Sequence, residues 1–145
     1  MFIGEYQHNV DSKGRVSLPV RFRDEISKPF YITRGMEHCL FIYDQEEWKK
    51  MDEKIRGLRL TAKVARAFSR LFYAGAMEVG LDKQGRFVIP PHLRSFAEIE
   101  KEVVLIGVSD RIEVWSKEAW ESYMGSDSMN YDDLTEELDQ MDLDL

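Results

Sequence analysis

The sequence has one cysteine, Cys39, and it lacks any run of about 18 apolar residues that could cross a membrane. A single cysteine cannot form an internal disulfide framework, so we expect a reducing, cytoplasmic environment. The opening Met1–Tyr6 lacks the basic and apolar regions of a signal peptide, and no membrane partner is expected. With 43% hydrophobic and 32% charged residues, the composition is that of a globular chain with a hydrophobic core.

Histidine and cysteine, which commonly carry catalysis or bind metals, are also scarce. The three histidines, His8, His38 and His92, have no partner at a useful spacing, and His38 beside Cys39 lacks the further ligands of a zinc site. No nucleophile elbow, P-loop, zinc-protease motif or dinucleotide-binding motif is present. We therefore expect no enzymatic activity, no small-molecule substrate, no cofactor and no metal.

Basic residues are absent from residues 125–145, which contain eight acidic ones. The net charge of −7 hides this uneven distribution, because residues 1–75 carry +4, residues 76–124 carry −3 and residues 125–145 carry −8. The acidic character of the chain thus comes from a tail, whereas its N-terminal half is basic. The overall charge therefore does not exclude a nucleic-acid partner.

The acidic segment 125–145 allows two interpretations. Its composition favours a disordered, solvated tail. Alternatively, Leu134, Leu138 and Met141 line one side of a helix that packs against a neighbour. A flexible acidic tail would compete with DNA for basic surface, so truncation after Gly125 would then tighten DNA binding, by more at about 50 mM than at about 200 mM salt.

The chain contains an internal repeat. The segment Asp11–Pro19 recurs as Asp82–Pro90, with the aspartate, glycine, arginine and proline matched at an offset of 71 residues. The similarity continues at an offset of 72, where Leu40–Trp48 corresponds to Ile112–Trp120. We therefore divide the chain into a first unit (1–55), a basic amphipathic connector (56–74), a second unit (75–124) and the acidic tail (125–145).

Both units predict the same order of elements. A strand leads to Asp11 or Asp82, a glycine turn follows, and a second short strand alternates apolar and polar residues. Pro19 or Pro90 then begins a short helix, and two further strands and a helix complete the unit. One unit alone would leave apolar faces open, so we expect both to intertwine about a pseudo-twofold axis in one barrel-like α+β domain.

Residues 60–76 favour an amphipathic connector helix, with apolar residues on one side and basic residues on the other. The apolar set is Val64, Phe68, Leu71 and Phe72, and the basic set is Arg59, Lys63, Arg66 and Arg70. An ordinary solvated helix face explains the basic set. A phosphate-facing stripe or a contact with an acidic neighbour are the alternatives.

The two glycine turns carry the candidate binding residues. Arg15 and Arg86 occupy the same position in their turns, and a pseudo-twofold axis would present both on one surface. An arginine side chain matches guanine edges and phosphates, and twofold-related arginines suit duplex DNA. The spacing equally allows each arginine to pair with its own aspartate, Asp11 or Asp82, and only hold the turn together. The other candidates are the turn lysines Lys13 and Lys83 and the helix arginines Arg21 and Arg23.

The doubled motif D-x-x-G-R-x-x-x-P and the opening Met1–Tyr6 closely resemble the MraZ family, one of the AbrB/SpoVT-like swapped-hairpin transcription factors. The resemblance covers about residues 1–124. It implies two tandem AbrB-like βαββα units that form a swapped-hairpin barrel with helices around it. It also implies ring-like homo-oligomers.

The function implied by the resemblance is that of a bacterial, nucleoid-associated regulator of the division and cell wall gene cluster. Such a protein binds short direct repeats in the double-stranded DNA upstream of its own operon. From the residues alone, the alternative is an oligomeric scaffold or nucleoid-associated protein that binds DNA or acidic partners without sequence preference.

The resemblance places residues of both turns at the DNA: Lys13 and Arg15 in the first copy, and Lys83 and Arg86 in the second. The two copies are not equally basic. Gln84 stands where the first copy has Lys13, and His92 stands where it has Arg21. We therefore expect the first turn to contribute more to binding.

Overall fold

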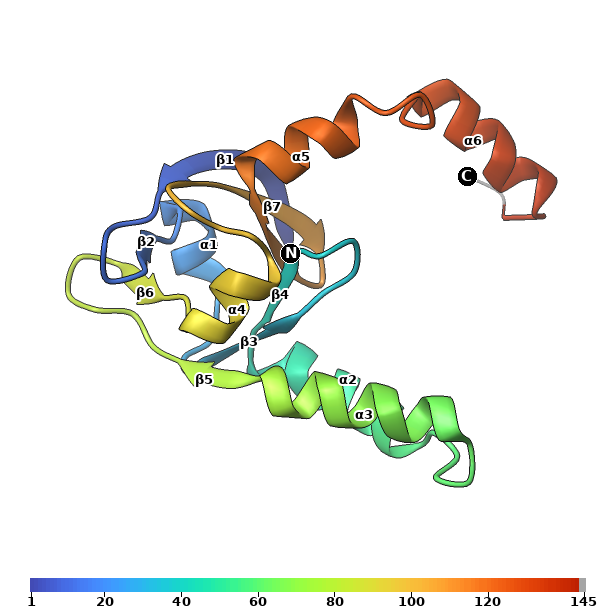
Figure 1. Cartoon of the computed structure of the whole chain (residues 1–145), viewed down its shortest axis with the longest axis horizontal. Coiled ribbons are helices and arrows are strands. Elements are labelled where there is room, and N and C mark those ends of the chain that lie inside the picture. The colour runs from blue at the N-terminus through green and yellow to red at the C-terminus, as the bar shows by residue number, and fades with distance from the viewer. Residues whose placement is uncertain (144–145) are drawn as a thin grey trace.

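A computed structural model describes residues 1–143 as two antiparallel sheets with six helices (Figure 1). The larger sheet has the order β1-β7-β8-β4-β3-β5, and β2 pairs with β6 in the smaller one. This confirms the expected α+β class. The strands are β1 (Phe2–Asn9), β2 (Arg15–Ser17), β3 (Phe30–Arg34), β4 (Leu40–Tyr43), β5 (Met77–Val79), β6 (Arg86–Val88), β7 (Glu102–Ser109) and β8 (Ile112–Ser116). The helices are α1 (Val20–Glu25), α2 (Gln45–Arg56), α3 (Lys63–Gly75), α4 (Pro91–Phe96), α5 (Lys117–Met124) and α6 (Tyr131–Gln140).

Four of the six strand pairs within residues 1–143 join the two repeat units, whereas β3–β4 and β7–β8 each lie within one unit. The first-unit strands β1, β2 and β4 pair with β7, β6 and β8, and β5 of the second unit pairs with β3. Arg15 lies opposite Val88, and Ser17 lies opposite Arg86, so exchanging the units exchanges these two pairs. The register therefore follows a pseudo-twofold axis that passes between β2 and β6 and between β4 and β8.

The short helices α1 and α4 close the core of this two-unit body. Each begins directly after the proline of its turn, because the fixed φ of proline suits the start of a helix. Each also buries one apolar residue at the same repeat position, Phe22 at 1% exposure and Leu93 at 0%. The Phe22 ring contacts Phe2 and Tyr6 edge to face, with centroid separations of 5.7 and 5.2 Å, which fixes α1 against β1.

A helical hairpin of α2 and α3 extends from the body (Figure 1). Asp44 caps α2 by accepting a hydrogen bond from the Glu47 N–H at 3.0 Å. Trp48 of α2 stacks on Phe72 of α3, with ring centroids 5.4 Å apart. This stacking orients α3 so that Phe72 faces α2. The other residues on the apolar side of α3 do not face α2.

The acidic tail contains helix α6, whereas its composition favoured disorder. The Asn130 side chain caps this helix by accepting from the Asp133 N–H at 3.1 Å, and acidic residues in the first turn suit the helix dipole. No residue of α6 is buried, and Figure 1 shows the helix standing away from the β body. The tail therefore forms an amphipathic helix that its own body does not cover.

Candidate nucleic-acid interface

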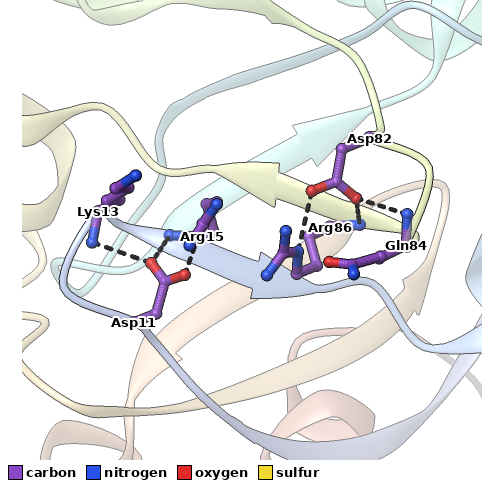
Figure 2. Close-up of polar contacts among 6 residues, drawn as sticks. All are labelled: Asp11, Lys13, Arg15, Asp82, Gln84 and Arg86. Atoms are coloured by element: carbon purple, nitrogen blue, oxygen red, sulfur yellow. Dashed lines mark hydrogen bonds and ion pairs between the residues drawn. The ribbon is translucent and has the colours of Figure 1, made fainter.

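Strands β2 and β6 form a two-stranded ribbon, the β2–β6 ribbon, that carries both turn arginines (Figure 2). Arg15 of β2 lies opposite Val88 of β6. Because alternate residues of a strand share a face, Arg86 lies on the same face as Val88 and therefore as Arg15. Diagonal neighbours of this kind are about 7–8 Å apart, so the two arginines lie close together on one face of the ribbon.

The other face of the ribbon belongs to the hydrophobic core. Val16 and Phe87, which are paired across the two strands, are 0% and 1% exposed. The Phe87 ring also contacts Phe30 edge to face, with centroids 5.9 Å apart. A slip of one residue would exchange the two faces of a strand, so burial of this pair fixes both arginines on the outer side.

Each turn arginine is held by the aspartate of its own turn. Nε of Arg15 donates to Asp11 Oδ2 at 2.5 Å, and Nε of Arg86 donates to Asp82 Oδ2 at 2.9 Å (Figure 2). Within residues 1–143 the Nη groups of both arginines make no hydrogen bond, and the two side chains are 33% and 29% exposed. The ion pair therefore orients each guanidinium and leaves its outer edge available to a ligand.

The aspartates also hold the backbone of the turns. Asp11 Oδ1 accepts hydrogen bonds from the N–H groups of Arg15 at 2.8 Å and Lys13 at 3.0 Å, and Asp82 forms the same pattern in the second turn. The backbone N–H of Arg15 contributes most to holding the pKa of the Asp11 carboxyl below its ordinary value. The ionised aspartate is thus part of the turn that presents the arginine.

This depressed pKa predicts a stability loss in acid that depends on Asp11. The ionised form stabilises the fold at neutral pH, and the contribution is lost as the pH falls below about 4 and through the lowered pKa. The Asp11→Asn variant should therefore lose less stability than the wild type between about pH 7 and about pH 3. Urea unfolding at both pH values measures the difference, and Asp82→Asn should behave alike. Identical acid sensitivity in wild type and variants would contradict this role.

Arginines from the short helices lie across the glycine turns of the opposite unit. Gly14 and Gly85 have φ of +81° and +76°, which glycine adopts without steric cost. A Cβ on Gly14 would lie 2.9 Å from Cζ of Arg94, and a Cβ on Gly85 would clash with the Arg23 guanidinium. Nε of Arg23 is buried and, within residues 1–143, has no hydrogen-bond partner. Arg23 therefore packs on the second turn instead of lying open beside the first.

The remaining predicted site residues lie at the surface. Lys13 and Lys83 are exposed in the two turns, which stand at opposite ends of the ribbon, and Arg21 is exposed on α1. Arg94 of α4 corresponds to Arg23 at the repeat offset, and its Nε donates to the Ile89 carbonyl at 3.0 Å.

Among residues 1–143, no group of three or more His, Cys, Asp or Glu side chains could hold a metal ion. Over the same residues, no helix combines the length and the apolar character needed to cross a membrane.

The family model described as "MraZ protein, putative antitoxin-like" matches residues 1–71 and again residues 72–142. The second match includes α6, beyond the 1–124 span of the resemblance. A protein of Finegoldia magna named transcriptional regulator MraZ is 57% identical over 143 residues, covering 99% of this chain and 100% of the relative. A protein of the same name from Caldanaerobacter subterraneus subsp. tengcongensis is 50% identical with the same coverage. The chain therefore belongs to the MraZ family.

Proposed function

We propose that this chain is a sequence-specific, DNA-binding regulator of transcription that inserts the β2–β6 ribbon into the major groove. The observation that carries this proposal is the outward-facing pair of Arg15 and Arg86, each oriented through Nε with its Nη groups available. The major groove admits a two-stranded ribbon, and a guanidinium can donate two hydrogen bonds to guanine O6 and N7. The name of the relatives, transcriptional regulator, supports the same class.

The lysines at the two ends of the ribbon have a different role in this proposal. Lys13 and Lys83 are point charges at exposed turns, which suits phosphate contacts on either side of the groove. Phosphate contacts fix the position of the protein but carry little sequence information. Arg21, exposed on α1, is placed to add a further phosphate contact.

The finer parts of the proposal follow the family resemblance. The DNA is a set of short direct repeats upstream of the chain's own operon, in the division and cell wall gene cluster, and the protein is nucleoid-associated. The fold is a swapped-hairpin barrel, which the pairing of β1 with β7 and β3 with β5 supports. The chain acts as a ring-like homo-oligomer, because several ribbons that engage tandem repeats together raise the overall affinity.

The second candidate function is DNA binding without sequence preference, which the exposed basic residues of α3 favour. Gel-shift competition between the upstream DNA and unrelated DNA of equal length separates the two. Specific binding predicts that unrelated DNA competes only at an excess of about 10³-fold or more at physiological salt. Equal competition would favour the second candidate and overturn the first.

A further inference from the structure

Helix α3 presents an uncovered apolar surface. Its side chains Val64, Phe68 and Leu71 are 77%, 42% and 58% exposed, and their spacing aligns them along one side of the helix. We call these three residues the α3 stripe. The inward-facing Phe72 is 4% exposed, so the contact with α2 is already made by a different side of α3. A row of exposed apolar residues beside charged ones is typical of a protein interaction surface.

The charge beside the α3 stripe has one sign. Lys63 and Arg70 are exposed, two helical turns apart, and nearer to the stripe than Arg59 and Arg66, because each directly precedes a stripe residue and lies about 100° around the helix from it. No acidic residue occurs between Lys54 and Arg70. A segment that covers the stripe should therefore be apolar on one side and acidic beside it.

Helix α6 has the complementary pattern. Leu134, Leu138 and Met141 repeat the spacing of the α3 stripe, and Met141 is 66% exposed. Asp133 and Glu137 lie one turn apart beside this apolar side. Within Tyr131–Gln140 the helix carries only acidic charges.

We propose that α6 of one copy packs its apolar side on the α3 stripe of a second copy, with its acidic edge beside Lys63 and Arg70. The proposal rests on the self-association included in the proposed function, and it names the segments that make the contact. Within one chain, α6 and α3 extend from different parts of the body (Figure 1). A second copy is therefore the occupant that the fold favours.

The contact would also determine the type of assembly. The helix α3 follows the first unit and α6 follows the second, so the contact joins unlike surfaces of two copies. After one such contact, the first copy still has its α3 stripe for a further neighbour, and the second copy still has its α6. Such head-to-tail contacts form closed rings when the rotation between copies closes.

Cross-linking of full-length chains tests the contact directly. Val64→Cys and Leu138→Cys variants, co-expressed with different tags and treated with a short bismaleimide, should form a covalent pair that contains both tags. The native thiol should react poorly, because Cys39 is 1% exposed and burial raises its pKa to about 12. The matched control replaces Val64→Cys with Glu53→Cys, which is exposed on α2 and outside the α3 stripe, and should give little product.

Charge exchange tests the pairing by a separate measurement. Arg70→Glu and Glu137→Arg should each raise the dissociation constant of the assembly about tenfold in sedimentation velocity, and the double variant should recover most of the loss. Truncation after Gly125 should likewise disperse the assembly.

Each failure of this proposal is distinguishable from failure of the proposed DNA binding. A wild-type assembly that neither cross-links nor responds to charge exchange would overturn the α3–α6 contact, while gel shifts report DNA binding independently. A monomeric wild type would overturn the contact and self-association together. If truncation leaves the assembly intact and tightens DNA binding at low salt, α6 competes with DNA and the contact is wrong.

Discussion

Replacing Arg15 with alanine is expected to abolish sequence-specific DNA binding, and more completely than replacing Arg86. A bidentate arginine–guanine contact contributes about 1–3 kcal/mol of discrimination. When several copies bind tandem repeats together, the assembly loses this contribution once for every copy. Arg15 follows Lys13, whereas the second turn has Gln84 at the corresponding position, so the first turn is the more basic. Fluorescence anisotropy with upstream and unrelated DNA measures both affinities.

The Arg15→Lys variant is the informative control. Lysine keeps the positive charge but lacks the planar fork, so this variant should retain non-specific binding and lose discrimination between the two DNAs. Losing the partly exposed ion pair with Asp11 should change the free energy of unfolding little, which circular dichroism melting can verify. Wild-type binding by folded Arg15→Ala and Arg86→Ala would mean that the arginines only hold their turns.

The order of elements could be predicted from the sequence because each turn depends on local chemistry. Gly14 and Gly85 both have positive φ, and Pro19 and Pro90 both precede a short helix. These properties belong to the residues themselves and act in each unit separately. The repeat therefore indicated the elements of both units from the same few residues.

The pairing of strands between the two units could not be predicted in the same way. The strands β2 and β6 have three residues each, and nothing local in Arg15–Ser17 identifies Arg86–Val88 as its partner. The pairing depends on burying Phe87 between the two units, which is a non-local requirement. The location of Arg23 has the same cause, because its side chain packs on a turn of the other unit.

The two interpretations of the turn arginines were alternatives in the sequence but are compatible in the structure. An ion pair through Nε occupies one edge of the guanidinium. The edge formed by the two Nη groups can still donate hydrogen bonds to a ligand. Residue spacing identifies the partner of an arginine but does not specify which nitrogen the partner engages. The aspartates therefore orient the arginines without occupying their Nη groups, as the proposed DNA contact requires.

Replacing Phe87 with alanine is expected to lower the free energy of unfolding by about 3–5 kcal/mol, a large part of the ~5–15 kcal/mol typical of a domain. Phe87 is 1% exposed, lies opposite Val16 and contacts Phe30. Its removal would leave a cavity under the β2–β6 ribbon that rigid neighbouring strands cannot fill. DNA binding should fall as well, because the buried face of the ribbon fixes where its arginines point.

The matched control for Phe87→Ala is Val88→Ala in the same strand. Val88 is 47% exposed on the outer face, so its truncation should change the free energy of unfolding by only about 0.5 kcal/mol. Urea unfolding at one fixed protein concentration compares the two, since self-association makes apparent stability depend on concentration. Equal losses in the two variants would contradict a ribbon that is anchored through its inner face, whereas a loss confined to Phe87→Ala would support that anchoring.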